Sequence, residues 1–211
     1  MNVLISLLTG FATAFIGITP PGLLNMTAAK VNLKEGKRNA VWFVLGAIII
    51  IFFQAFTAIL FARVINVRPD IIILLREVGF ALFGALTVYF LLIAKAPKLK
   101  KAKIKKSSQK KRFFLGMLLS ALNFFPIPYY VFVSITLSSY DIFSFELSSI
   151  LTFVSGVVLG SFVVFYFYIE FFQKIELKAD YMLRNMNTII GSITGAISIV
   201  TLFNIIRFYL D

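Results

Sequence analysis

The chain has 211 residues, of which 60% are hydrophobic and 14% charged, with a formal net charge of +12. Soluble domains carry about 25% charged residues, so this composition excludes an ordinary soluble domain and predicts an integral membrane protein. The sequence contains no cysteine and no histidine. This excludes disulfides, thiolate and imidazole metal ligands and a histidine proton relay, and we expect no cofactor and no metal site.

Six apolar segments are long enough to cross a bilayer, which takes roughly 20 apolar residues per helix. They predict an all-α integral membrane protein with six transmembrane helices. The N-terminal segment lacks a basic region and a small-residue cleavage site, so we interpret it as a retained first span. Gly36 is the expected turn residue after that span, and residues 173–187 are expected to form a polar loop. The predicted spans cover residues 3–29, 39–62, 71–94, 113–137, 147–172 and 188–209.

Basic residues are divided unequally between alternate loops. The loops after the first, third and fifth spans carry four, ten and three lysines and arginines, and the opposite side carries the remaining four. Positive charge marks the cytoplasmic side of a membrane protein. The pattern therefore predicts a multi-pass inner (plasma) membrane protein with both termini outside the cytoplasm.

The segment 95–112 is the one long polar stretch, with ten basic residues among its 18 and no acidic residue. We interpret it as a solvated cytoplasmic loop that fixes the topology. Binding to anionic lipid head groups is the next interpretation. Nucleic-acid binding is the least favoured, because no aromatic residues alternate with the lysines. Membrane lipid is thus an expected partner, and nucleic acid is not.

Proline motifs interrupt the first and fourth predicted spans. Each proline removes a backbone donor and clashes with the preceding turn, so it frees a carbonyl. In a bilayer, freed backbone groups are tolerated only against protein or a water-filled cavity, so the two breaks predict a cavity near the middle of the membrane. A structural kink is the alternative interpretation of each proline by itself. The carbonyls expected to be free are those of Ile16, Gly17, Leu122 and Phe124.

The two halves of the chain share short motifs in the same order. Three spans per half is an odd number, so a second copy must lie upside down in the membrane, which predicts a 3+3 inverted repeat with helices 1 and 4 broken at the proline motifs. The expected organisation is one transporter domain over 1–211, with repeats at 1–94 and 113–211 joined by the linker 95–112. For the glycines of spans 2, 3, 5 and 6 we favour a role in close helix packing. The matching pairs are Gly10 with Gly116, segment 43–46 with 153–156, and Gly84 with Gly195.

The breaks also predict a binding site. The start of a half-helix presents N–H groups that suit a carboxylate, and freed carbonyls suit an ammonium. Two breaks that face each other would suit a zwitterionic amino acid without any charged side chain, and amides and hydroxyls add donors and acceptors. The predicted substrate-binding residues are Thr19, Pro20, Pro21, Gly22, Asn25, Thr27, Asn123, Pro126, Pro128, Tyr129 and Tyr130.

Acidic residues within the spans are few. Glu77 and Glu170 lie near span ends, where we favour a salt bridge or a solvated side chain, with Lys174 the expected neighbour of Glu170. No carboxylate stands at a midplane position as a proton carrier.

The motif Pro21–Gly22–Leu23, together with Gly36, Gly46, Gly116 and Asn123, resembles the LysE/RhtB family of amino-acid exporters, the lysine, homoserine and threonine exporter type. The resemblance implies efflux of amino acids or similar small solutes across the inner membrane, driven by the proton gradient. Leu23 stands where the family pattern Pro-Gly-Pro has its second proline. The segment 123–126 replaces the family's Asn-Pro-Lys-Ala and lacks its lysine, so a strict lysine exporter is not supported.

Our hypothesis is a secondary exporter that works by alternating access, with a small-molecule substrate and protons as partners and a homo-oligomer left open. One alternative is an ion or metal-cation exporter, which the absence of Cys and His disfavours. Another is a membrane scaffold that transports nothing, which leaves the paired breaks unexplained. An enzyme is not expected, because no nucleophile, acid–base pair or metal cluster appears.

Overall fold

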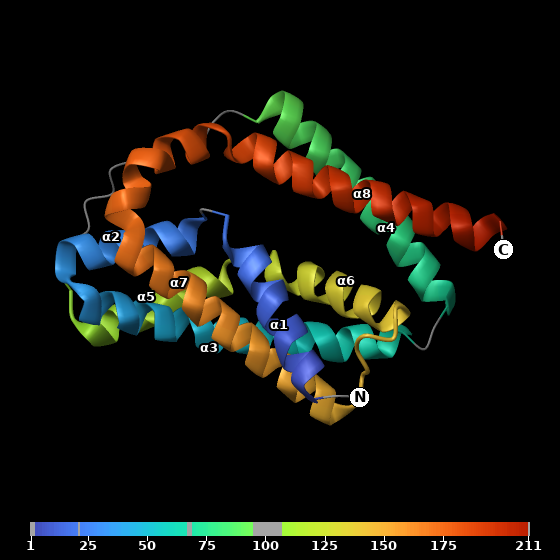
Figure 1. Ribbon diagram of the computed structural model, residues 1–211, viewed down its shortest axis with the longest axis horizontal. Helices are drawn as coiled ribbons and strands as arrows, with labels where there is room; N and C mark the ends of the chain where they lie inside the picture. Colours follow the sequence, from blue (N-terminus) through green and yellow to red (C-terminus); the bar gives the residue numbers. More distant parts are fainter. Residues whose placement is uncertain (1–2, 21, 67–68, 95–106, 211) are drawn as a thin grey trace. The chain divides into compact units, whose positions relative to one another are not determined.

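The computed structural model describes residues 3–20, 22–66, 69–94 and 107–210, without the side chains of 69–72, 75, 172–184, 186 and 189. Within these ranges the chain is all-helical and has no strand, as predicted (Figure 1). The helices are α1 (Val3–Ile18), α2 (Leu23–Glu35), α3 (Lys37–Asn66), α4 (Pro69–Val88), the short π-helix η1 (Tyr89–Ile93), α5 (Gln109–Ala121), α6 (Pro126–Ser139), α7 (Leu147–Arg184) and α8 (Met186–Leu210).

Four stretches of helix are long and apolar enough to cross a membrane: Lys37–Asn66, Arg76–Ile93, Leu147–Phe171 and Ile190–Leu210. Two further helix pairs pass the same test when each pair is taken together. They are α1 with α2, bent by 78°, and α5 with α6, bent by 61°. The number of candidate spans is therefore four, or up to six if each bent pair is one span, which agrees with a multi-pass membrane protein.

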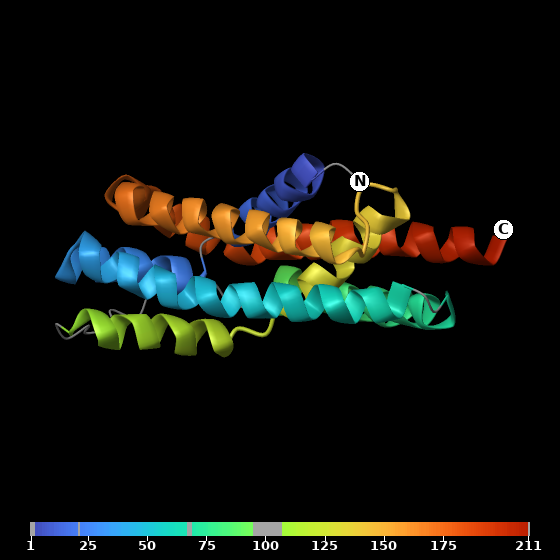
Figure 2. The same ribbon diagram turned by 90° about the horizontal axis from the view of Figure 1, so that it is seen from below.

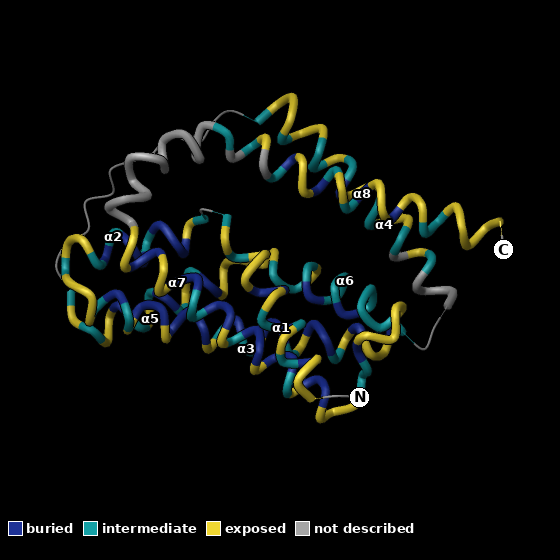
Figure 3. The backbone as a smooth tube through the Cα atoms, in the orientation of Figure 1, coloured by how far each residue is buried: buried dark blue, intermediate teal, exposed yellow. Residues whose placement is uncertain are grey.

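The chain forms two compact units. Unit 1 comprises residues 1–63 and 101–176, and it contains α1, α2, α5, α6, most of α3 and the longer part of α7. Its core runs along α3 and along residues 149–169 of α7, where buried residues recur on both helices (Figure 3). Unit 2 comprises residues 64–100 and 177–211, in which α4 and η1 pack against α8. Every described residue of the predicted binding site lies in unit 1.

Two glycines allow α1 and α7 to cross with their backbones in contact. A Cβ atom at Gly10 would lie 2.1 Å from the carbonyl oxygen of Phe153, and one at Gly156 would lie 2.1 Å from that of Leu7. Real Cβ atoms do not approach a carbonyl oxygen so closely, so only glycine fits at either position. Small residues serve helix packing in membranes in this way, because lipid tails leave van der Waals contact as a main driving force.

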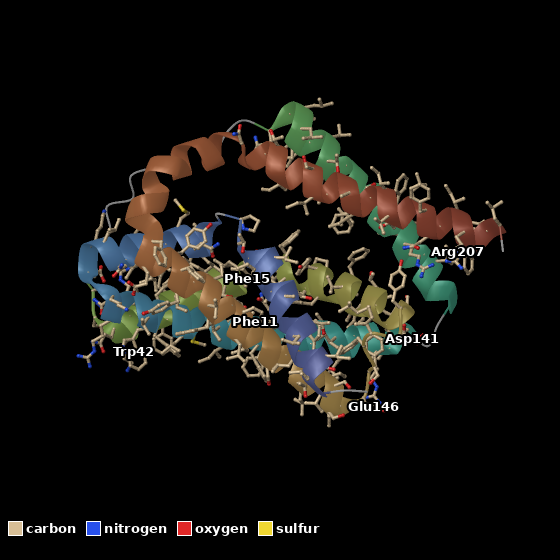
Figure 4. The ribbon with its side chains drawn as sticks, viewed as in Figure 1. Phe11, Phe15, Trp42, Asp141, Glu146 and Arg207 are labelled. Atoms are coloured by element: carbon tan, nitrogen blue, oxygen red, sulfur yellow. The ribbon has the colours of Figure 1, made fainter. Side chains whose placement is uncertain are left out.

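A second crossing of the same kind joins α3 and α5, which lie side by side (Figures 1 and 2). A Cβ at Gly46 would lie 2.0 Å from the Phe113 carbonyl oxygen, and one at Gly116 would lie 2.0 Å from that of Phe43. Next to this crossing the ring of Trp42 meets the ring of Phe113 edge-on (Figure 4). The predicted packing role of Gly46 and Gly156 is confirmed.

In unit 2, glycines also lie at the contact between α4 and α8, but the two helices pack less closely there than at the crossings in unit 1. A Cβ at Gly195 would lie 3.2 Å from the Thr87 methyl carbon, and one at Gly84 would lie 3.5 Å from the Ser198 hydroxyl. The Thr87 hydroxyl donates a hydrogen bond to the Thr194 hydroxyl across the same contact, at 3.0 Å. The predicted packing role is confirmed for Gly195, whereas a Cβ at Gly84 would make only an ordinary van der Waals contact, so that role stays a prediction there.

Two of the predicted loops are wrong in extent. The segment 173–187 was expected to be a polar loop, but α7 continues through it to Arg184. Its residues are mostly good helix formers with no Gly or Pro before residue 191, so loss of hydropathy there marks the expected end of the membrane and not the end of the helix. The turn predicted at Gly36 is confirmed, because this residue has φ +89° and separates α2 from α3. The loop is shorter than expected, since Gly36 is the one residue between the two helices. Of the linker 95–112, residues 95–106 lie outside the described residues.

We predict that Gly46→Ala lowers the stability of the protein by roughly 1–3 kcal/mol, because the new methyl group would overlap the Phe113 carbonyl and force α3 away from α5. Thermal unfolding in detergent measures the effect. Gly79→Ala is the matched control, since nothing lies within 4 Å of the Cβ it would add and alanine favours the helix. Equal unfolding temperatures for the two variants would contradict the tight crossing.

Candidate functional site

The first break lies between Ile18, the last residue of α1, and Leu23, the first residue of α2. Gly22 precedes α2 in an extended conformation, with φ −114° and ψ 179°. The carbonyls of Ile18 and Pro20 both accept hydrogen bonds from the Asn25 side-chain nitrogen, at 2.6 and 3.0 Å. Asn25 is only 3% exposed, so a buried amide holds the unwound backbone in place.

Hydroxyl groups also donate hydrogen bonds to backbone carbonyls around the first break. The Tyr168 hydroxyl, from α7, donates to the Thr19 carbonyl at 2.7 Å. The Thr19 side chain itself is bonded back to the carbonyl of Phe15 at 2.5 Å, and the Thr27 hydroxyl is bonded back to Leu23 at 2.6 Å. Both threonines therefore use their only hydroxyl proton within their own helical segment, which leaves them as acceptors. Pro21 was also predicted for this site, but it lies outside the described residues.

The second break lies between Ala121, where α5 ends, and Pro126, where α6 begins. Proline suits the first turn of a helix because the N–H it lacks would have no partner there. The carbonyl of Phe124 was expected to be free, and that prediction is wrong: it accepts a hydrogen bond from the Ile127 N–H at 3.2 Å. Pro128 is the third residue of α6, so it lies within the same first turn.

Gln54 of α3 holds the second break, and the sequence analysis missed it. Its side-chain nitrogen donates to the carbonyls of Ser120 and Asn123, at 3.1 and 2.9 Å. Gln54 is only 8% exposed, whereas Asn123, which was predicted for the binding site, is exposed. A lone amide in a long apolar run is the signal that points to it, because an unpaired amide in an apolar setting costs several kcal/mol.

Tyr129 brings α6 against α1 beside the first break. Its hydroxyl donates to the Thr13 carbonyl at 2.9 Å, and a Cβ at Gly17 would lie 2.8 Å from its ring. Tyr130, also predicted for the site, is 2% exposed, and its hydroxyl lies next to Ser161 of α7. Tyr129 therefore links the segments that contain the breaks, and the ring of Tyr130 lies beside it.

Two ion pairs in the described part of unit 1 join helix ends, away from the breaks. The Arg112 guanidinium binds the Glu35 carboxylate through two nitrogens, one of them at 2.8 Å, and Asn39 donates to the same carboxylate at 3.3 Å. Both charged side chains are buried. The interpretation of residues 95–112 as a solvated loop is therefore wrong for Arg112, which lies in the first turn of α5.

The two acids singled out in the spans are both bound by neighbouring side chains. Glu170 forms a salt bridge as predicted, but its partner is the ammonium group of Lys37 at the start of α3. The same ammonium donates to the Tyr166 hydroxyl at 2.7 Å. In unit 2, Glu77 accepts a hydrogen bond from the Tyr209 hydroxyl at 2.7 Å. Among the described residues, no group of three His, Cys, Asp or Glu could hold a metal ion.

The family comparison covers both breaks. A family model described as LysE type translocator matches residues 15–204, and the chain belongs to this family. Comparisons with curated proteins and with solved structures gave no match. The proteins of this family are membrane translocators that export amino acids or small molecules, and they are not enzymes. The helix breaks described above are therefore part of a translocator.

We predict that Arg112→Met destabilises the protein by roughly 3–5 kcal/mol, because it leaves the Glu35 carboxylate buried without its counter-charge. Thermal or denaturant unfolding of the purified protein measures the loss. Lys110→Met removes an exposed cation from the same helical turn and should change stability little. If the two variants unfolded alike, the ion pair would not be buried as described.

Proposed function

We propose, from the chain's membership of the LysE-type translocator family, that it is a secondary exporter of amino acids or related small metabolites across the inner membrane, driven by the proton gradient. The observation that carries the proposal is the pair of broken helices in unit 1. At each break an amide side chain binds two backbone carbonyls: Asn25 at the first and Gln54 at the second. Such an amide lets the chain leave the helix inside an apolar setting, because it gives the carbonyls at the break a hydrogen-bond partner.

The two breaks offer partial charges of both signs without a charged side chain. The helix α2 begins at the first break, and the first N–H groups of a helix have no partner within it. The start of α6 adds no free N–H group, because Pro126 and Pro128 lack one and those of Ile127 and Tyr129 are bonded to the carbonyls of Phe124 and Phe125. Free N–H groups attract a carboxylate, while backbone carbonyls and amide oxygens attract an ammonium. This combination supports a zwitterionic amino acid as the substrate class. The residues we propose to line its path are those predicted above, with Gln54 added.

The glycine crossings support the proposed 3+3 inverted repeat. In one crossing Gly10 of α1 meets Phe153 of α7, and in the other Gly116 of α5 meets Phe43 of α3. An offset of 106 residues relates Gly10 to Gly116, and one of 110 residues relates Phe43 to Phe153. The second contact is thus the first with the two halves exchanged, which is what an internal two-fold relationship between repeats requires.

The remaining crossing partners follow the same rule. Gly156 meets Leu7 on α1, and Gly46 meets Phe113 on α5, again with offsets of 110 and 106 residues. Within unit 2, Gly84 faces Ser198, and Gly195 faces Thr87, with one offset of 111 residues for both. Alternating access by two inverted three-helix repeats is the transport mechanism that this arrangement supports. No observation on the described residues favours the ion, metal-cation or scaffold alternatives.

We expect cells that contain the protein to release one group of labelled amino acids selectively, and to lose that release when the proton gradient is collapsed. Asn25→Ala should abolish the release, because it removes the donor that holds the Ile18 and Pro20 carbonyls. Asn204→Ala on α8 is the control and should export normally. The amount of each protein in the membrane is measured in parallel. Wild-type efflux by a fully inserted Asn25→Ala protein would refute this role of the first break.

The proposed orientation can be tested separately, because the chain has no cysteine of its own. Ser107→Cys places a thiol within the basic linker, and it should be protected from a membrane-impermeant thiol reagent in intact cells. Glu146→Cys, exposed in the loop before α7, should be labelled (Figure 4). The opposite labelling pattern would place both termini in the cytoplasm.

A further inference from the structure

Three buried side-chain atoms in the described part of the chain have no hydrogen-bond partner: the Gln54 amide oxygen and the hydroxyl oxygens of Ser120 and Ser6. Buried polar atoms in native proteins nearly always have a partner, so each exception requires an explanation. Two of the three belong to residues that are bonded to each other at the second break, since the Gln54 nitrogen donates to the Ser120 carbonyl. Two of the three unsatisfied groups therefore lie at the second break, and the third is on α1.

The orientation of the Gln54 amide is fixed by the backbone around it. Its nitrogen has two hydrogens, and both are used by the carbonyls of Ser120 and Asn123. If the amide were turned over, an amide oxygen would face two carbonyl oxygens, which is repulsive. The position of the Gln54 amide oxygen is therefore fixed, and no described group donates a hydrogen bond to it. The neighbouring Ser120 hydroxyl adds a second group that can accept.

These groups favour a ligand that donates hydrogen bonds, and they disfavour an anion. The amide oxygen and the two carbonyls all carry partial negative charge, and a carboxylate placed there would be repelled. A protonated amine carries up to three N–H donors and a positive charge, so it can satisfy several acceptors together. No carboxylate is needed, which suits a cargo that must also leave the site.

We propose that Gln54 and Ser120 form the subsite that binds the ammonium group of the transported solute at the second break. The inference rests on the proposed export function and names the part of the solute that this break recognises. It also assigns the carboxylate end of a zwitterion to the other break, where α2 begins. Gln54 then has two roles, since its nitrogen holds the backbone and its oxygen binds the cargo.

The test compares solutes that differ only in the ammonium group. Purified protein is reconstituted into liposomes, and transport is measured for leucine against 2-hydroxyisocaproate and for phenylalanine against phenyllactate. The readout is the ratio of kcat/KM for each amino acid to that for its hydroxy analogue. Gln54→Met should lower this ratio roughly tenfold or more, because it removes a hydrogen bond to a charged group. Ser120→Ala should lower it several-fold, and Ser6→Ala, which removes the unpaired hydroxyl on α1, should leave it unchanged.

The outcomes separate the subsite from the export function. The subsite is refuted if Gln54→Met folds and leaves the ratio unchanged, including the case in which transport of both members of a pair falls equally. Gln54 then only holds the break, and the proposed export function stands. If Gln54→Met does not fold, Ser120→Ala decides, since it removes a single oxygen atom, and an unchanged ratio refutes the subsite. If the wild-type protein moves neither leucine nor phenylalanine, the same comparison is made with an amino acid that the cells release and its hydroxy analogue. If cells release no amino acid at all, the export function fails and the subsite with it.

Discussion

Under the proposed six-span arrangement, both helix breaks of unit 1 lie within a bilayer, where backbone carbonyls must find a partner inside the protein. Asn25 meets this requirement at the first break by donating to Ile18 and Pro20, and Gln54 meets it at the second by donating to Ser120 and Asn123. One amide nitrogen with two hydrogens thus serves two carbonyls in each case. The breaks are therefore specified structures, held by side chains, and not merely places where a proline stops a helix.

These bonds require close helix contacts, which the glycines provide. Tyr168 reaches the Thr19 carbonyl from α7, and α7 lies against α1 because Gly10 and Gly156 let the two backbones touch. Gln54 reaches the second break from α3, which crosses α5 at Gly46 in the same manner. Packing of this kind depends on surface fit more than on hydrophobic burial, so small residues are what bring the polar groups within hydrogen-bond distance.

The sequence was sufficient for the features that depend on local chemistry. Hydropathy predicted a multi-pass, all-helical protein, and Gly36 was recognised as a turn. The proline motifs stand where α1 gives way to α2 and α5 to α6, while six spans with two of them broken remain part of the proposal. The sequence was not sufficient for the partners, which come from elsewhere in the chain: Gln54 lies far from the break that it holds, and Arg112 pairs with a distant Glu35. Hydropathy also misplaced the end of α7, because it reports where apolar residues stop and says nothing of hydrogen bonding along a polar helix.

The placement of charge in unit 1 bears on how a polar solute could cross it. The ion pairs Arg112–Glu35 and Lys37–Glu170 join helix ends, while the groups described at the breaks are neutral amides, hydroxyls and backbone. Under the proposed function, a zwitterion bound at the breaks would meet only partial charges, each weaker than an ion pair. Transport requires binding that is favourable enough to admit the solute and weak enough to release it. A site built from neutral groups meets both conditions, and it leaves the full charges to fix how the helix ends fit together.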